Sequence, residues 1–296
     1  MARFLVVLLL QVVVVCQSYE LKRLTDLPKA KGFACIPVPV ERLVAPGQRA
    51  TMHVYDSSSL QVIRHAQAHS NSEYGQVVID AKAMAERKFA VEELGSRVKV
   101  LSVAPSTHTD KFGGTSPSMM VEVIGVGVIE PKNVIEKMPF MTIECSDGDL
   151  LLHPPAELPE GVAELTAGFA ELAALCESLD EVTSFKGPLT QATIKEAVKE
   201  ATAAGSDDDG CDAWSLEACV DKVIALRDVD EVTDASRLVL SALATTVHLP
   251  GRVRLEAMKL ANEGQASRLV DFVAGALEEE GKVRLAKKAL SGLSLG

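Results

Sequence analysis

The pattern of apolar residues changes near residue 155, and this change limits the folds that are open to the chain. Before it, short runs rich in β-branched residues alternate with turn residues; after it, Ala, Leu, Glu and Lys dominate at helical spacing. A strand-rich half followed by a helical half predicts an α+β architecture. His153-Pro154-Pro155 interrupts both patterns, so we place the connection between the two halves there.

Several segments of the first half have the composition of β-strands. The predicted strands are Phe33 to Val40, Arg49 to Tyr55, Tyr74 to Asp80, Val91 to Val103, Ser118 to Ile129 and Phe140 to Glu144. Pro46-Gly47 predicts a turn, and the glycine-rich stretch 110–117 predicts an exposed loop or hairpin tip. Residues 57–68 carry Leu60, Ile63 and Arg64 at helical spacing and predict one short helix. Short strands separated by turns favour a small β-barrel.

The second half predicts a bundle of short helices. Apolar faces at helical spacing follow residue 159, and an acidic linker at 204–212 separates them from a further face that starts at Leu216. The later predicted helical segments are Asp234 to Leu249, Val253 to Ala261, Ser267 to Leu277 and Lys282 to Leu290. Gly281 separates the last two. Helices of this length are marginal alone, so we expect them to pack together.

The first 18 residues predict a secretory signal peptide. A positive start at Arg3 precedes an apolar run to Cys16, and Cys16 and Ser18 are small residues before a cleavage point ahead of Tyr19. An uncleaved anchor or a buried strand is the alternative, and after cleavage we expect no stable membrane span. Residues 19–32 form a linker or a basic, transit-like segment. We therefore expect the secretory pathway, or alternatively the plastid of an alga whose plastids lie within endomembranes.

Charge and cysteine content narrow the partners. A formal charge of −11 and a pI near 5.1 argue against nucleic-acid binding, which requires clustered Lys and Arg. Scattered cysteines without CxxC spacing predict neither a disulfide framework nor a zinc site. A bridge between Cys35 and Cys145 would require the first and last strands to adjoin; buried or idle thiols are the simpler interpretation.

The order of features in the first half resembles a known domain family. The strand Ile36-Pro37-Val38-Pro39-Val40 is followed by the turn 44–47, the strand Met52-His53-Val54-Tyr55-Asp56, a short helix and the strand 74–79. This order is similar to that of the LON domain, the PUA-like barrel at the start of Lon proteases and in cereblon-type adaptors. Arg254 to Met258 and Ser267 to Leu269 resemble the closing pattern of the helical bundle that accompanies it.

The resemblance implies two domains, a LON-type barrel at 33–155 and a helical bundle at 156–296. Two departures stand out. Ser57-Ser58-Ser59 occupies the place of the family's Pro-Arg-Tyr, and Gly127-Val128 the place of a later Arg-Phe pair.

The sequence carries no recognisable catalytic set. It has no GxxxxGK phosphate loop and no GxSxG nucleophile elbow, so we expect neither the ATPase nor the protease of Lon, no other enzyme activity and no cofactor. His65 and His69 are four residues apart but lack the intervening Glu of a zinc motif, and a solvated helix face is favoured over metal binding. His108 with Ser106 and Asp110 is interpreted as ordinary polarity of one loop.

The resemblance implies a non-catalytic module for substrate recognition in proteostasis. It would bind unfolded or client polypeptides and pass them to a separate protease or chaperone. The candidate contact residues are Tyr55, Ser57, Leu60, Lys111 and Phe112. For any one of them, simple filling of the barrel is an equal alternative. A small-ligand or RNA-binding PUA-like module is the competing function, and an apolar pocket would favour the small ligand.

Overall fold

The computed structural model describes residues 32–80, 83, 86, 90–148, 216–227 and 234–293. The predicted signal peptide, nearly all of the segment 19–32, the first predicted helices and the acidic linker at 204–212 lie outside these residues.

Six strands form one mixed sheet. They are β1 (Phe33–Val38), β2 (Arg49–Val54), β3 (Glu73–Ile79), β4 (Val91–Thr109), β5 (Thr115–Glu136) and β6 (Met141–Gly148). β1 and β3 are parallel, and the other pairs are antiparallel. The pairings run from β1 through β3, β4, β5 and β6 back to β1, and this closed circuit is called the barrel below. β2 pairs with the first half of β5 and stands outside the circuit.

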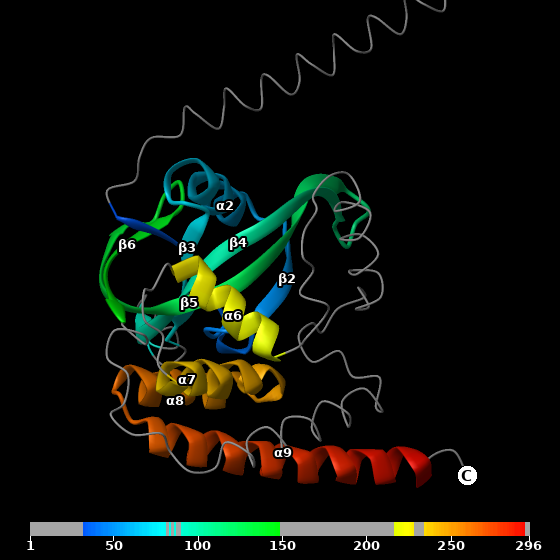
Figure 1. Cartoon of the computed structure of the whole chain (residues 1–296). Helices are drawn as coiled ribbons and strands as arrows, with labels where there is room; N and C mark the ends of the chain where they lie inside the picture. The colour runs from blue at the N-terminus through cyan, green and yellow to red at the C-terminus, as the bar shows by residue number, and fades with distance from the viewer. Residues whose placement is uncertain are drawn as a thin grey trace, which may run out of the picture.

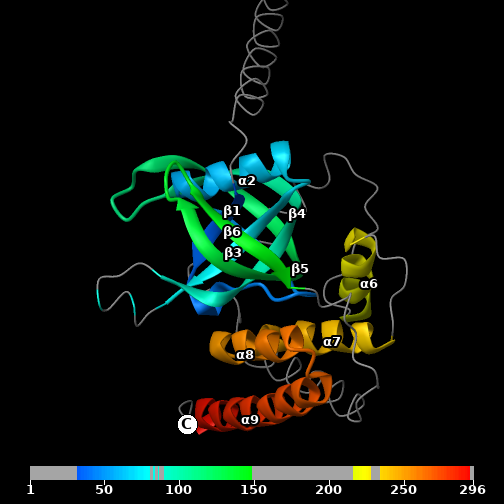
Figure 2. The same ribbon diagram turned by 90° about the vertical axis from the view of Figure 1, so that its left-hand side faces the viewer.

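Helices cover two ends of the barrel, as Figures 1 and 2 show. Helix α2 (Ser57–His69) joins β2 to β3 at one end, and its N-cap Asp56 accepts a hydrogen bond from the Ser59 backbone N–H at 2.8 Å. At the opposite end lie α7 (Asp234–Thr245), α8 (Gly251–Asn262) and α9 (Ala266–Leu293). The remaining elements are α6 (Leu216–Arg227) and the 3₁₀ turns η1 (Val40–Arg42) and η2 (Thr246–His248). The predicted α+β class is confirmed.

The predicted lengths of β4, β5 and β6 were wrong, and β6 continues to Gly148. β4 and β5 extend to Thr109 and from Thr115, because the two strands pair with each other up to the turn that joins them. The polar residues near the tip therefore belong to a hairpin rather than to a long loop. The helix break expected at Gly281 is also wrong, since α9 runs through it. Ion pairs one turn apart support that stretch, with Lys282 Nζ 2.9 Å from Glu278 and Arg284 Nε 2.7 Å from Glu280.

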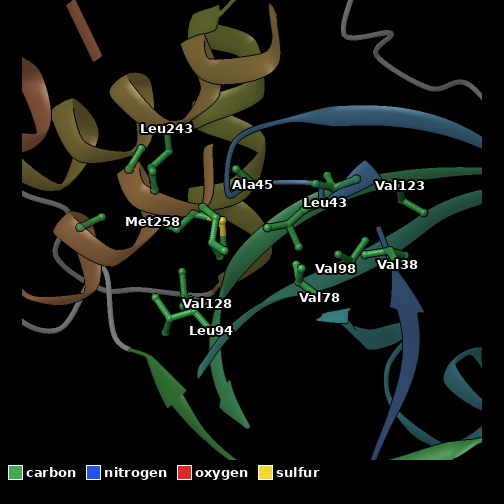
Figure 3. Close-up of a cluster of buried hydrophobic side chains, with 14 of the residues drawn as sticks. Val38, Leu43, Ala45, Val78, Leu94, Val98, Val123, Val128, Leu243 and Met258 are labelled. Atoms are coloured by element: carbon green, nitrogen blue, oxygen red, sulfur yellow. The ribbon is translucent and has the colours of Figure 1, made fainter. Parts of the chain in front are cut away.

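The barrel interior and the C-terminal helices share one hydrophobic core. Leu43 and Val128 from the barrel belong to the same buried cluster as Leu243 of α7 and Met258 of α8 (Figure 3). This burial is the main force holding the helices to the sheet. The helices therefore close one end of the barrel and share its core.

Two glycines allow backbones to approach closely at this junction. A Cβ at Gly251, the first residue of α8, would lie 2.3 Å from the Val40 carbonyl oxygen of η1. A Cβ at Gly125 of β5 would lie 2.2 Å from the Ala45 oxygen. Gly125 also exchanges backbone hydrogen bonds of 2.9 Å with Gly47 and Gln48. These contacts fix the chain just before β2 against both β5 and the helices.

The first and last strands do adjoin, as a bridge between Cys35 and Cys145 would require. Both cysteines are nevertheless free thiols in the structure. Cys35 is fully buried, and its burial raises the pKa of the thiol well above its ordinary value. The interpretation as a buried thiol therefore describes Cys35, whereas Cys145 is half-buried.

Candidate functional site: the slot along strand β2

Strand β2 has one unpaired edge. It pairs with β5 through residues 49–54 on one side, and within the described residues no strand pairs with its other side. In an antiparallel pair, alternate residues direct their backbone N–H and C=O groups away from the partner strand. An open edge of this kind is a template for a further strand.

A cavity of about 170 Å³ lies along this open edge. One wall is β2 itself, at residues 49–50 and 52–55; the other wall is the facing chain at 36–39 and 41–44, from β1 through η1. We call this cavity the β2 slot. Its walls include apolar side chains from both sides, among them Val38, Leu43, Met52 and Val54. Asp56 and Ser59 at the start of α2 lie at one end, and Gln48, Val247 and Arg254 lie at the other.

Gln48 connects the wall of the slot to the helices. Its side-chain Nε2 donates to Thr246 Oγ1 at 2.9 Å and to the Leu243 carbonyl at 3.2 Å. Its Oε1 accepts from the Ala45 N–H at 3.1 Å. All of these groups are buried, so each hydrogen bond replaces one that water would otherwise make. The helical end of the slot is thus a fixed floor.

The facing wall is held from inside the barrel by buried polar side chains. The Val44 N–H donates to Gln76 Oε1 at 2.8 Å, and the Ser96 hydroxyl donates to the Val44 carbonyl. Gln76 Nε2 in turn donates to the Tyr74 hydroxyl at 3.4 Å. Complete burial raises the pKa of Tyr74 well above its ordinary value, so its phenol stays protonated. Both walls of the slot are therefore rigidly positioned.

Arg254 of α8 forms the floor together with Gln48. Only 8% of its surface is exposed. Its Nη atoms donate to the carbonyls of Leu43, Val247 (3.2 Å) and Leu249 (3.3 Å). Its Nε has no hydrogen-bond partner in the described part of the chain. Desolvation lowers the pKa of Arg254 to about 10, although Glu41 opposes the shift, so the guanidinium remains charged at neutral pH.

Three aromatic rings gather at the opposite end, which we call the rim. Tyr55 stacks on His108 of β4, with ring centroids 4.1 Å apart and planes 10° from parallel. His53 meets both rings edge-on at 5.7 Å, and its Nε2 lies 2.7 Å from Ser118 Oγ. Burial, and secondarily His108, lowers the pKa of His53, which favours a neutral imidazole. The rim is therefore an aromatic platform, of which Tyr55 is 48% exposed.

The structure brings only one of the five predicted contact residues to the slot, namely Tyr55. Ser57 is exposed in the first turn of α2, whereas Leu60 is half-buried and packs against the core. Lys111 and Phe112 lie in the turn of the β4–β5 hairpin. The Phe112 ring is 86% exposed, and Lys111 Nζ lies 5.0 Å from its centroid. Phe112 thus exposes apolar surface in the hairpin turn and does not line the slot.

Sequence reasoning missed the contributions of His108, Gln48 and Arg254. The assignment of Ser106 and His108 to one polar loop was wrong, because both belong to β4. His108 could have been found from the alternation of β4, had the strand been extended past Pro105. No local signal marks Arg254 as buried, because its environment is supplied by chain some 200 residues earlier, at Leu43.

Solved structures that are similar to this chain include two Lon N-terminal domains. The N-terminal domain of the Lon protease from Mycobacterium avium complex is 14% identical, with a TM-score of 0.34, over 77% of this chain and 98% of that one. The Lon N-terminal domain protein from Xanthomonas campestris is 13% identical, with a TM-score of 0.34, over 66% of this chain and 98% of that one. No protein-family model and no curated protein matches the sequence.

No helix in the described ranges is both long and apolar enough to cross a membrane. In the same ranges, no group of three or more His, Cys, Asp or Glu side chains could hold a metal ion.

Proposed function

We propose that this chain is a non-catalytic protein-binding module that takes up extended polypeptide segments along the open edge of β2. The single observation that carries the proposal is the coincidence of that unpaired edge with the β2 slot. A polypeptide in extended conformation offers backbone N–H and C=O groups that can pair with the unpaired groups of such an edge. Its alternate side chains could then enter the slot.

The slot and the rim favour the binding of apolar polypeptide segments. The slot walls carry aliphatic side chains beside charged ones such as Arg42 and Arg49, and the rim adds the exposed ring of Tyr55, stacked on the ring of half-buried His108. Aromatic surfaces of this kind contribute large contact area at a low cost in conformational entropy. Unfolded proteins expose apolar side chains on extended backbone, whereas folded proteins bury them. The geometry therefore suits clients that are unfolded.

We further infer that the barrel is of the PUA-like type and that the chain is a relative of the LON substrate-binding family. The order of strands, turn and helix across residues 36–80 supports this inference. A module that binds clients without acting on them would need a separate protease or chaperone as its partner. The net charge of −11 speaks against RNA as the ligand.

The test is a binding titration with the full-length chain. A fluorescently labelled, permanently unfolded polypeptide is the ligand, its folded parent is the control, and anisotropy is the readout. We expect saturable binding of the unfolded form alone. Equal binding of both forms, or of neither, would refute client recognition.

A pair of variants locates the binding at the rim. Tyr55→Ala removes an exposed ring at the slot, and Leu290→Ala removes an exposed apolar side chain on α9, remote from it. We expect the first to weaken binding by about tenfold, as loss of a contact worth ~1.4 kcal/mol would, and the second to leave it unchanged. Equal effects would place the binding surface elsewhere.

A small apolar ligand is the second candidate, because apolar side chains contribute to both walls of the slot. Backbone N-methylation distinguishes the two functions. Methyl groups at alternate residues of a bound peptide should abolish strand pairing in one register and not in the other. Equal loss in both registers, or none in either, would favour side-chain or small-ligand binding over strand addition.

A further inference from the structure

We infer that the floor of the β2 slot captures the C-terminal carboxylate of the bound polypeptide, with Arg254 as the group that receives it. This inference rests on the proposed function and names the part of the client that the slot recognises: a chain end whose last residue is apolar.

The charge of Arg254 favours an anionic ligand. Its guanidinium is buried and bonded only to backbone carbonyls, which carry no net charge. In the described part of the chain no carboxylate forms an ion pair with it; Glu41, whose charge raises its pKa, is exposed and lines the same slot. A buried charge is costly unless an opposite charge accompanies it. A cationic side chain in a cavity wall favours an anionic group in the cavity.

Arg254 lies at the closed, helical end of the β2 slot. Gln48 is bonded to α7 and η2 there, and Gly251 presses the start of α8 against η1. A chain that lies along β2 could not continue through these elements. A carboxylate at the floor therefore belongs to a chain end and not to an internal Asp or Glu side chain. The client would lie with its C-terminus at the floor and its preceding residues toward the rim.

The volume of the slot limits the size of the client's last side chain. The slot holds about 170 Å³. A cavity of about 150 Å³ lined by aliphatic side chains accommodates benzene. The slot thus admits one side chain between Leu and Phe in size beside the carboxylate.

The test compares two peptides on the full-length chain. Both are labelled octapeptides of the same apolar sequence ending in Leu, one with a free C-terminal carboxylate and one with a C-terminal amide. We expect the acid to bind about 10- to 100-fold more tightly, the range that corresponds to a hydrogen bond to a charged group. Equal affinity of acid and amide would overturn the inference.

Binding of the permanently unfolded polypeptide distinguishes failure of carboxylate capture from failure of the proposed function. If it binds while acid and amide peptides bind equally, carboxylate capture fails and client recognition stands. If neither peptide nor the unfolded polypeptide binds, the proposed function itself fails. N-acetylleucine, used as a competitor against N-acetylleucinamide, gives a further check. If N-acetylleucine displaced the peptide at the peptide's own affinity, the site would belong to small carboxylates and recognition of chain ends would be refuted.

A matched pair of variants assigns the effect to one side chain. Arg254→Met should abolish the preference for acid over amide, whereas Arg252→Met should keep it. Arg252 lies on the same helix but is exposed and pairs with Glu92 at 2.6 Å. Circular dichroism and the unfolding midpoint check that each variant is folded. If Arg254→Met does not fold, the acid-to-amide ratio on the natural sequence decides alone. A retained preference in folded Arg254→Met would exclude Arg254 as the receptor.

Discussion

Strands β2 and β6 pair with the same strand, β5, but they differ in whether their other edge is paired with a second strand. β6 pairs with the second half of β5 and also with β1, and this closes the barrel. β2 pairs with the first half of β5 and has no second strand partner among the described residues. Below, the two regions are called the closed side and the open side.

The difference shows how one long strand can serve both stability and recognition. On the closed side, Ile129, Met141 and Ile143 form a compact buried cluster with Cys35. On the open side, the outward face of β2 is polar: Arg49 pairs with Glu122, which also accepts a hydrogen bond from the Ser102 hydroxyl at 3.2 Å. Unpaired strand edges are liabilities that proteins protect with charge and coverage. Here the edge is left open only where the slot adjoins it.

The largest effect should come from breaking the junction that precedes the open strand. Gly125→Ala would place a methyl group 2.2 Å from the Ala45 oxygen, so the backbone must shift. We expect a loss of about 3 kcal/mol in the free energy of unfolding, typical of overpacking against rigid backbone. Chemical denaturation at equilibrium measures it.

Gly275→Ala is the matched control for that change. Gly275 lies inside α9, where an added Cβ meets nothing within 4 Å. We expect it to stabilise the protein by up to about 1 kcal/mol, because Ala is the better helix former. A loss from Gly275→Ala equal to that of Gly125→Ala would mean that close approach is not the cause.

A difference of about 2 kcal/mol should separate the two sides directly. Ile143 on β6 is almost completely buried, whereas Met52 on β2 is half-buried and lines the slot. We expect Ile143→Ala to cost about 3 kcal/mol and Met52→Ala about 1 kcal/mol of unfolding free energy. Peptide binding should show the reverse order. If Met52→Ala were the more destabilising change, the open side would be part of the structural core.

The smallest effect concerns pH and has one histidine on each side. Burial lowers the pKa of His53 at the rim and of His65 on α2, whose ring lies 5.2 Å from that of Phe140, next to β6. The unfolded chain therefore binds more protons than the folded one just below pH ~6.5. This contribution to stability is complete above that pH and is lost as the pH falls through it.

Denaturation at pH 7.5 and 5.5 measures this loss. His65→Gln and His53→Gln should each reduce the difference in unfolding free energy between the two pH values. We expect the larger reduction from His65, which is the more completely buried side chain. A pH dependence that is unchanged in both variants would exclude these histidines as its source.

Local pattern was sufficient to predict elements whose stabilising contacts are close in sequence. The helix at 57–68 followed from its apolar spacing, and the structure adds only one residue, His69, to it. Residues 104–109 and 130–136 were not predicted as strand, because Pro105 and Pro131 argue against one. Pairing across the hairpin and with β6 determines their structure instead. The site followed the same rule. Tyr55 was predicted from its place at the end of the strand 49–55, but its stacking partner His108 comes from another strand.

The hydrogen bond between Gln48 and Thr246 joins positions 198 residues apart in the chain. During synthesis, β1 and β2 leave the ribosome long before α8 has been made. In the nascent chain the β2 slot would therefore have its two walls but not its floor. The edge of β2 could then pair with other strands at the end that the helices later cover. Arg254 arrives among the last structured residues. On the ribosome, completion of the C-terminal helices would thus be the event that turns an exposed edge into a selective one.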